Sequence, residues 1–170
     1  MNLRYLSIIA AVALVAACES PSKDNGAANS SGNNASTTAP ASDTSGVGKG
    51  SQADFVANVG DRVFFGFNKS DLTPDARAQL DKWVAFLKAY PSDSLTVEGH
   101  CDERGTVEYN LALGDRRATS VKNYLVAQGI DAARLKTISY GKSRPAVMGH
   151  NEDAWKQNRR GVGVVQAPRA

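Results

Sequence analysis

Apolar residues follow two different periods along the C-terminal part of this chain. Residues 61–65 contain a short apolar run that Gly66 closes, and residues 95–98 alternate between apolar and polar side chains, so each segment predicts a β-strand. Between them, apolar residues recur every three or four positions from residue 76 onward, which predicts a helix with one buried face. The residues of that face are Ala76, Leu80, Trp83, Val84 and Leu87.

Local sequence features mark where the helices begin and end. Thr73, Pro74 and Asp75 supply a capping hydroxyl, a proline suited to the first helical position and an acid for the first turn. The first helix therefore begins near Pro74 and ends at Tyr90-Pro91. A second stretch of helical period covers residues 108–128, and Gly129 follows it as a C-terminal cap.

The rest of the chain adds further strands to the sheet. Residues 135–140 alternate as a third strand, residues 153–160 form a short helix or turn, and residues 162–165 form the last strand. Gly161 and Gly163 weaken that last strand, so we expect it at an edge of the sheet. The order of the elements predicts an α+β domain, with a small mixed four-stranded sheet and helices packed on one face.

The amino terminus has the pattern of an exported protein. Arg4 precedes an apolar run at residues 7–15, which is too short to span a membrane. Val-Ala-Ala before Cys18 resembles the bacterial lipobox, in which the cysteine becomes the acylated first residue of the mature protein. Several acyl chains would anchor the protein stably. Lipoproteins retained in the inner membrane typically have Asp directly after the cysteine, so Glu19 at that position implies the outer membrane. The alternative is a soluble secreted protein in which Cys18 is coincidental.

Residues 18–54 lack the large apolar side chains that a core requires. Val47 is the only one between residues 19 and 52, and small or polar residues fill most other positions. This composition predicts a flexible tether. We therefore divide the chain into a lipoprotein signal peptide at residues 1–17, the acylated cysteine with its linker at 18–54, and one domain at 55–170.

Charge and cysteine content narrow the function classes. The chain has 20 Lys and Arg against 17 Asp and Glu, a net charge of +3. Such a small net charge, without a cluster of basic residues along one face, argues against nucleic-acid binding. If Cys18 carries lipid, Cys101 has no second cysteine to pair with in an oxidising compartment, and we expect a buried thiol.

A metal site or cysteine catalysis is a possible alternative near Cys101. His100, Asp102 and Glu103 are its neighbours, and His150 could join from afar. However, adjacent residues of an extended segment point in opposite directions, and no second Cys or His stands at ligand spacing. A hydrolase would also need a nucleophile with its base, or paired carboxylates at working distance. We therefore expect that the protein binds no metal or cofactor and is not an enzyme.

Charged residues gather at residues 99–117, where the second strand gives way to the second helix. Several motifs there and beyond resemble, in order and spacing, the peptidoglycan-associated lipoproteins of the Tol-Pal system, a branch of the OmpA-like domain family. These motifs are GHCDERG at 99–105, YNLALG at 109–114, RRA at 116–118, SYGKSRP at 139–145 and NRR at 158–160.

The resemblance implies a protein that binds the diaminopimelate side chain of peptidoglycan without cutting it, and so holds the outer membrane to the cell wall. Asp102 and Arg117 match the family's ligand pair. The further positions that match ligand-lining residues of the family, or that lie at the start of the second helix, are Arg104, Phe67, Asn68, Leu113 and Thr106. The family commonly has Asp where this chain has Asn68, so ammonium recognition should depend more on Asp102.

The resemblance also implies partners, a compartment and supporting residues. The domain would lie in the periplasm, with peptidoglycan, a TolB-type propeller protein and other Tol components as partners. The alternative function is that of a protein-interaction module of the Tol system, for which wall binding is secondary. We expect Arg116 and Glu103 to be structural or solvated, His100 to be a hydrogen-bonded histidine, and residues 158–160 to support the pocket.

Overall fold

A computed structural model of the protein describes residues 48–167. The predicted signal peptide, the predicted acylation site Cys18 and most of the predicted linker lie outside the described residues. Within the described part of the chain, no helix is long and apolar enough to cross a bilayer.

Four strands form one mixed sheet in the order β1-β4-β2-β3. The strands are β1 (Arg62–Phe64), β2 (Ser94–His100), β3 (Leu135–Gly141) and β4 (Arg160–Gln166). β2 and β3 run parallel, as expected for strands joined through a helix, whereas β4 is antiparallel to both β1 and β2. The predicted small mixed sheet is therefore confirmed.

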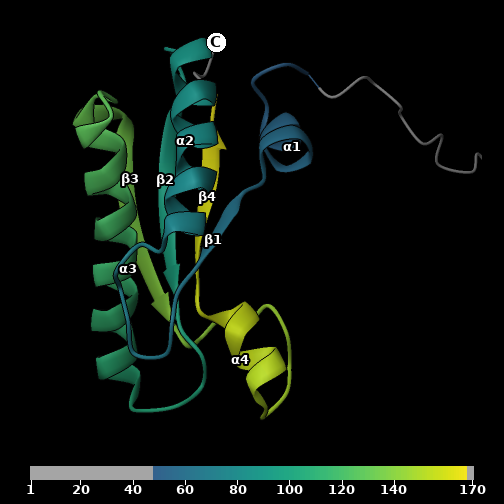
Figure 1. Ribbon diagram of the computed structural model, residues 1–170, viewed down its shortest axis with the longest axis vertical. Coiled ribbons are helices and arrows are strands. Elements are labelled where there is room, and N and C mark those ends of the chain that lie inside the picture. Colours follow the sequence, from purple (N-terminus) through teal and green to yellow (C-terminus); the bar gives the residue numbers. More distant parts are fainter. Residues whose placement is uncertain (1–47, 168–170) are drawn as a thin grey trace, which may run out of the picture. The chain divides into compact units, whose positions relative to one another are not determined.

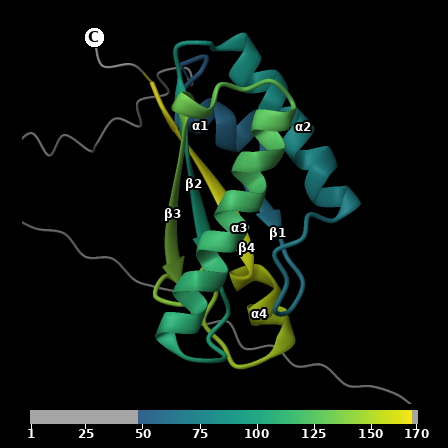
Figure 2. The same cartoon turned by 90° about the vertical axis from the view of Figure 1, so that its left-hand side faces the viewer.

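Two long helices, α2 (Pro74–Ala89) and α3 (Val107–Ala127), cover one face of this sheet (Figures 1 and 2). Thr73 caps α2, and its hydroxyl accepts a hydrogen bond from the Ala76 amide. α3 ends as predicted, because Gly129 follows it at a φ of 90°. The predicted bounds of both helices differ from the observed ones by about one residue at each end, within the usual uncertainty of helix termini.

Shorter helical segments complete the domain. α4 (Glu152–Asn158) precedes β4, and a 3₁₀ turn (Ala132–Arg134) precedes β3. The sequence did not predict α1 (Gln52–Asp54) and the π-helical turn that follows it (Phe55–Val59). Helical structure thus begins inside the segment predicted as linker, because Phe55 of the following turn is fully buried in the core.

The prediction that the last strand lies at an edge is wrong, because β4 is a central strand between β1 and β2. Its glycines have a packing role. A Cβ atom at Gly163 would lie 3.0 Å from the rings of both Phe55 and Trp83. Those rings meet edge to face with centroids 5.4 Å apart. Glycine in β4 therefore makes room for core aromatic residues, each of which stabilises the fold by roughly 1.5–3 kcal/mol through burial.

Two further glycines bring α3 close to the sheet. A Cβ atom at Gly99 in β2 would lie 1.8 Å from the carbonyl oxygen of Gly114 in α3, so the two backbones meet without side chains between them. This contact fixes the first half of α3 beside the end of β2. Residues that follow β2 therefore lie next to residues that project from α3.

Candidate functional site

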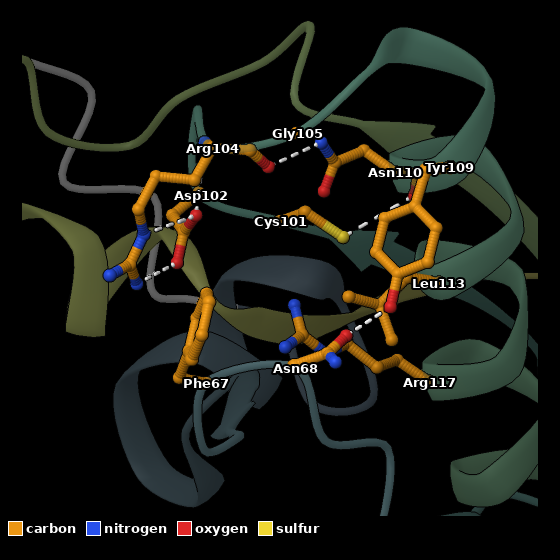
Figure 3. Close-up of a pocket in the computed structure, with 10 residues that line it drawn as sticks. All are labelled: Phe67, Asn68, Cys101, Asp102, Arg104, Gly105, Tyr109, Asn110, Leu113 and Arg117. Atoms are coloured by element: carbon orange, nitrogen blue, oxygen red, sulfur yellow. Dashed lines mark hydrogen bonds and ion pairs between the residues drawn. The ribbon is translucent and has the colours of Figure 1, made fainter.

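A concave pocket of about 170 Å³ opens where β2 ends and α3 begins (Figure 3). Three segments form it: the loop that follows β1, the loop from β2 to α3, and α3 itself. Its lining residues are Phe67, Asn68, Cys101, Asp102, Arg104, Gly105, Tyr109, Asn110, Leu113 and Arg117.

The pocket brings together six of the seven residues that the sequence singled out as ligand-binding. These are Asp102, Arg117, Arg104, Phe67, Asn68 and Leu113. Thr106 is not among the lining residues. Its hydroxyl accepts a hydrogen bond from the Tyr109 amide at 3.1 Å and caps α3. Thr106 therefore shapes the start of the helix that carries Arg117.

Asp102 is buried, with only 4% of its surface exposed, and four donors surround its carboxylate. The backbone amide and Nε of Arg104 donate to Oδ1, both at 3.1 Å. Nη2 of Arg104 donates to Oδ2 at 2.6 Å, and Arg159 donates to the same oxygen at 3.3 Å. Burial alone would raise the pKa of Asp102, but these bonds and the charge of Arg104 hold it below its usual range. The carboxylate is therefore ionised at neutral pH.

Arg117 is fully buried and is held by the backbone rather than by a carboxylate. Its guanidinium donates to the carbonyl oxygens of Lys69 at 2.8 Å, His100 at 2.7 Å and Gly66 at 3.0 Å. Burial lowers the pKa of Arg117 from its ordinary value. One side chain thus ties the loop after β1 to the end of β2, which the sequence could not reveal.

Tyr109 and Asn110 are lining residues that the sequence analysis did not single out, although both belong to the YNLALG motif. The Tyr109 hydroxyl donates to Oδ1 of Asn68, across the pocket mouth (Figure 3). Asn110 is buried, and its amide donates to the carbonyl oxygens of Arg104 at 2.8 Å and Thr106 at 2.9 Å. These bonds fix the loop that carries Asp102.

Cys101 is buried at the back of the pocket, as predicted. Its thiol donates to the carbonyl oxygen of Asn110 at 3.4 Å. Burial raises the pKa of the Cys101 thiol, and a protonated thiol is a poor nucleophile. In the part of the chain that the structure describes, no three His, Cys, Asp or Glu side chains gather so that they could hold a metal ion.

His100 is only partly the satisfied histidine that the sequence predicted. The residue is 1% exposed, Nε2 lies 3.2 Å from Oε2 of Glu98, and Nδ1 has no hydrogen-bond partner within residues 48–167. Burial, together with the charges of Arg160 and Arg144, lowers the pKa of His100 to about 4. The ring is therefore neutral at physiological pH.

The NRR motif supports the pocket from behind, as predicted. Oδ1 of Asn158 accepts hydrogen bonds from the amides of Ala146 and Val147, so it holds the loop before α4. Arg159 is buried and donates to Asp102, to Glu152 and to the carbonyl oxygen of Phe65 at 3.1 Å.

Arg160 donates to the carbonyl oxygen of Arg144 at 3.2 Å, which completes the supporting role of the motif. Arg116 is exposed on α3, in agreement with the prediction of a solvated residue. Glu103 is structural, because its carboxylate accepts hydrogen bonds from His150 and Trp155.

Residues 64–159 match the model of the OmpA family. The chain is 50% identical over 116 residues to the peptidoglycan-associated lipoprotein of Rhizobium meliloti, a match that covers 68% of this chain and 66% of that relative. It is 43% identical over 159 residues to the peptidoglycan-associated lipoprotein of Haemophilus influenzae, covering 94% and 95% of the two chains.

A solved structure shows the same fold. The crystal structure of the peptidoglycan-associated lipoprotein from Burkholderia pseudomallei superposes with a TM-score of 0.61 at 39% identity, over 62% of this chain and 90% of that one. The C-terminal domain of Helicobacter pylori MotB superposes with a TM-score of 0.59 at 18% identity, over 64% and 85% of the chains, and so shares the fold alone.

Proposed function

Because this chain belongs to the OmpA family, we propose that it is an outer-membrane lipoprotein that binds peptidoglycan non-covalently through the diaminopimelate of the wall peptide. In this proposal Cys18 carries the lipid, the following segment is a tether, and the domain in the periplasm holds the wall. The lipoprotein relatives and the match of residues 64–159 support this proposal.

The convergence of one acid and two Arg side chains in one pocket carries the proposal. The far end of diaminopimelate has an ammonium and a carboxylate on a single carbon, so its receptor needs an acceptor and a cation a few ångströms apart. Asp102 supplies the acceptor, and Arg104 and Arg117 supply guanidinium groups from different segments. Guanidinium forks bind carboxylates in two-point fashion. The three side chains together therefore suit a small zwitterion.

Burial makes this recognition stronger than it would be on an open surface. Arg117 lines the pocket but is shielded from solvent, and three backbone carbonyls occupy three of its five N–H groups. A ligand carboxylate that reached the remaining N–H groups would meet little competition from water. Leu113 and Phe67 would contact the aliphatic stem of diaminopimelate.

Asn68 occupies the position where the family commonly has Asp. Its backbone adopts a φ of 56°, in the left-handed region that Asn tolerates better than most residues. Its Oδ1 accepts the hydrogen bond from Tyr109 and faces the same pocket. Asn68 can therefore still accept a hydrogen bond from an ammonium group, but without the Coulomb attraction of a carboxylate.

We propose that the protein binds the wall without cutting it, and that a TolB-type propeller protein and other Tol components are further partners. The buried thiol of Cys101, with its raised pKa, is not a competent nucleophile. The neighbouring acid Glu103 is occupied by His150 and Trp155. Binding and tethering thus fit the pocket better than hydrolysis does.

Cosedimentation with purified wall sacculi tests this function. The wild-type domain should sediment with the sacculi, release no soluble fragments and be displaced by free meso-diaminopimelate. Asp102→Asn should lose binding because it removes the charge while keeping the shape. The matched control is Asp115→Asn, an exposed acid on α3, which should bind as the wild type does. Unimpaired binding by the Asp102 variant would overturn the assignment.

The lipid anchor needs a separate test in the full-length chain. Cys18→Ser should leave the domain folded and able to bind sacculi, yet free of the membrane fraction. Unchanged membrane fractionation of that variant would show that Cys18 is not the anchor.

A further inference from the structure

Two aromatic rings flank the guanidinium of Arg104. Its Cζ lies 4.0 Å from the ring centroid of Phe67 and 3.9 Å from that of Trp155. Phe67 comes from the loop after β1, whereas Trp155 lies on α4 and is not among the residues that line the pocket. Aromatic rings from two distant segments of the chain therefore contact the same guanidinium.

Trp155 also holds the residue that precedes Arg104. Its indole Nε1 donates to Oε1 of Glu103 at 2.9 Å, while its ring contacts Arg104. Lys142 also restrains this loop, because its ammonium donates to the carbonyl oxygens of Glu103 and Gly105. The loop after Asp102 is thus positioned from outside the pocket.

The same guanidinium pairs with Asp102. Its Nε donates to Oδ1 and its Nη2 donates to Oδ2 of Asp102 (Figure 3). This ion pair is partly open to water, since 31% of the Arg104 side chain is exposed. A long side chain loses rotamer freedom when it is held in one geometry. Contact with the two rings restrains the guanidinium in addition to its bonds with Asp102.

We propose that Trp155 is a positioning residue of the binding pocket, which acts through Arg104 to set the affinity for wall peptide. The inference rests on the proposed function. A zwitterion that enters the pocket must share Asp102 and Arg104 with the existing ion pair. The pocket is ready for this exchange only if Arg104 already lies against the two rings. Without the indole ring, Arg104 would sample other rotamers and the ligand would have to order it, which lowers affinity.

A double-mutant cycle with Arg104 tests this coupling by sacculus cosedimentation isotherms. Trp155→Ala should weaken binding about fivefold, the size expected for loss of one cation–π contact. In an Arg104→Ala background, the same change should have no further effect. Equal losses in both backgrounds would overturn the inference, because they would show that Trp155 acts independently of Arg104.

Further variants separate stacking from general support of the fold. Trp155→Phe keeps an aromatic face and should restore most of the affinity, whereas Trp155→Leu fills the space without such a face and should bind as weakly as the Ala variant. Lys156→Ala, an exposed neighbour on α4, is the matched control and should bind normally. A Leu variant that bound as tightly as the wild type would refute the stacking role, even if the Ala variant failed to fold.

A second readout needs no wall material. In an NMR titration of the Asp102 carboxyl, Trp155→Ala should raise the pKa toward its ordinary value, because a loosened Arg104 stabilises the carboxylate less. Lys156→Ala should leave that pKa unchanged. Failure of the wild-type domain to cosediment would refute the proposed function. An unaltered Asp102 pKa in the Trp155 variant would refute this inference alone.

Discussion

Arg117→Ala should destabilise the domain strongly, and the structure allows the size of the effect to be worked out. The guanidinium donates to three carbonyl oxygens, those of Gly66, Lys69 and His100. A buried acceptor left without its donor costs about 1–3 kcal/mol. Three such losses are partly offset because a buried charge no longer has to be desolvated. The net expectation is a loss of about 3–4 kcal/mol in the free energy of unfolding.

Urea denaturation followed by far-UV circular dichroism measures this loss. With a slope of about 2 kcal/mol per molar urea, the midpoint should fall by roughly 1.5–2 M. Domains of this kind have a total stability of about 5–15 kcal/mol, so the variant should remain folded at 25 °C without denaturant. Arg116→Ala, the exposed neighbour, should change stability by less than about 0.5 kcal/mol.

A stability within about 1 kcal/mol of the wild type would refute the reasoning, because it would show that the three carbonyls are satisfied without Arg117. The expected loss also affects how binding data are interpreted. Arg117 holds the pocket together, so failure of Arg117→Ala to bind sacculi would not distinguish a lost ligand contact from a distorted loop. Asp102→Asn is the better test of ligand recognition for this reason.

Three further predictions concern pH, packing and the ligand pocket. The folded pKa of His100, about 4, lies below its ordinary value of 6.5, so stability should be complete above pH 6.5 and fall by up to about 3 kcal/mol as the pH drops through 4. Urea midpoints at several pH values measure this, and an equally steep curve in His100→Gln would contradict it. Gly99→Ala should unfold the domain or shift α3, because its Cβ would clash with the Gly114 carbonyl, and a melting temperature near that of the wild type would be the opposing result. Asn68→Asp should tighten sacculus binding modestly by adding a negative charge near the ligand ammonium, whereas weaker binding would show that the amide is an adapted feature.

Most of the fold could be predicted from local sequence because its main helices and strands bury regular faces. The period of α2 and its capping residues at Thr73 and Pro74 are visible without knowledge of the sheet. The segment with α1 was missed because its anchors have no regular period. Phe55 is buried, and Gln52 exchanges hydrogen bonds with the backbone of Gly163 and Val165 in β4. β4 was misplaced because glycine weakens an isolated strand, whereas here Gly163 faces Trp83.

The sequence predicted most of the residues that line the candidate site but not how they contact one another. The motifs identified most of the lining residues, and Asp102 and Arg117 do line the same pocket. In the free protein each of the two side chains is held by other groups of the chain. Asp102 is paired with Arg104 and Arg159, and Arg117 is bonded to the backbone. Trp155 was missed because it lies far along the chain from the residue on which it stacks.

The sequence by itself determined the main helices and strands of this domain, the burial of the Cys101 thiol, and the residues from which a zwitterion site could be made. These properties depend on side-chain period and on residue type, which are local. Only the tertiary structure decided which charge meets which partner. The order of the sheet and the close contact between Gly99 and Gly114 place α3 beside the end of β2. That placement lets Arg117 donate to three backbone carbonyl oxygens and brings Arg104 into contact with two aromatic rings. Such contacts join distant parts of the chain, so they depend on how the helices pack against the sheet.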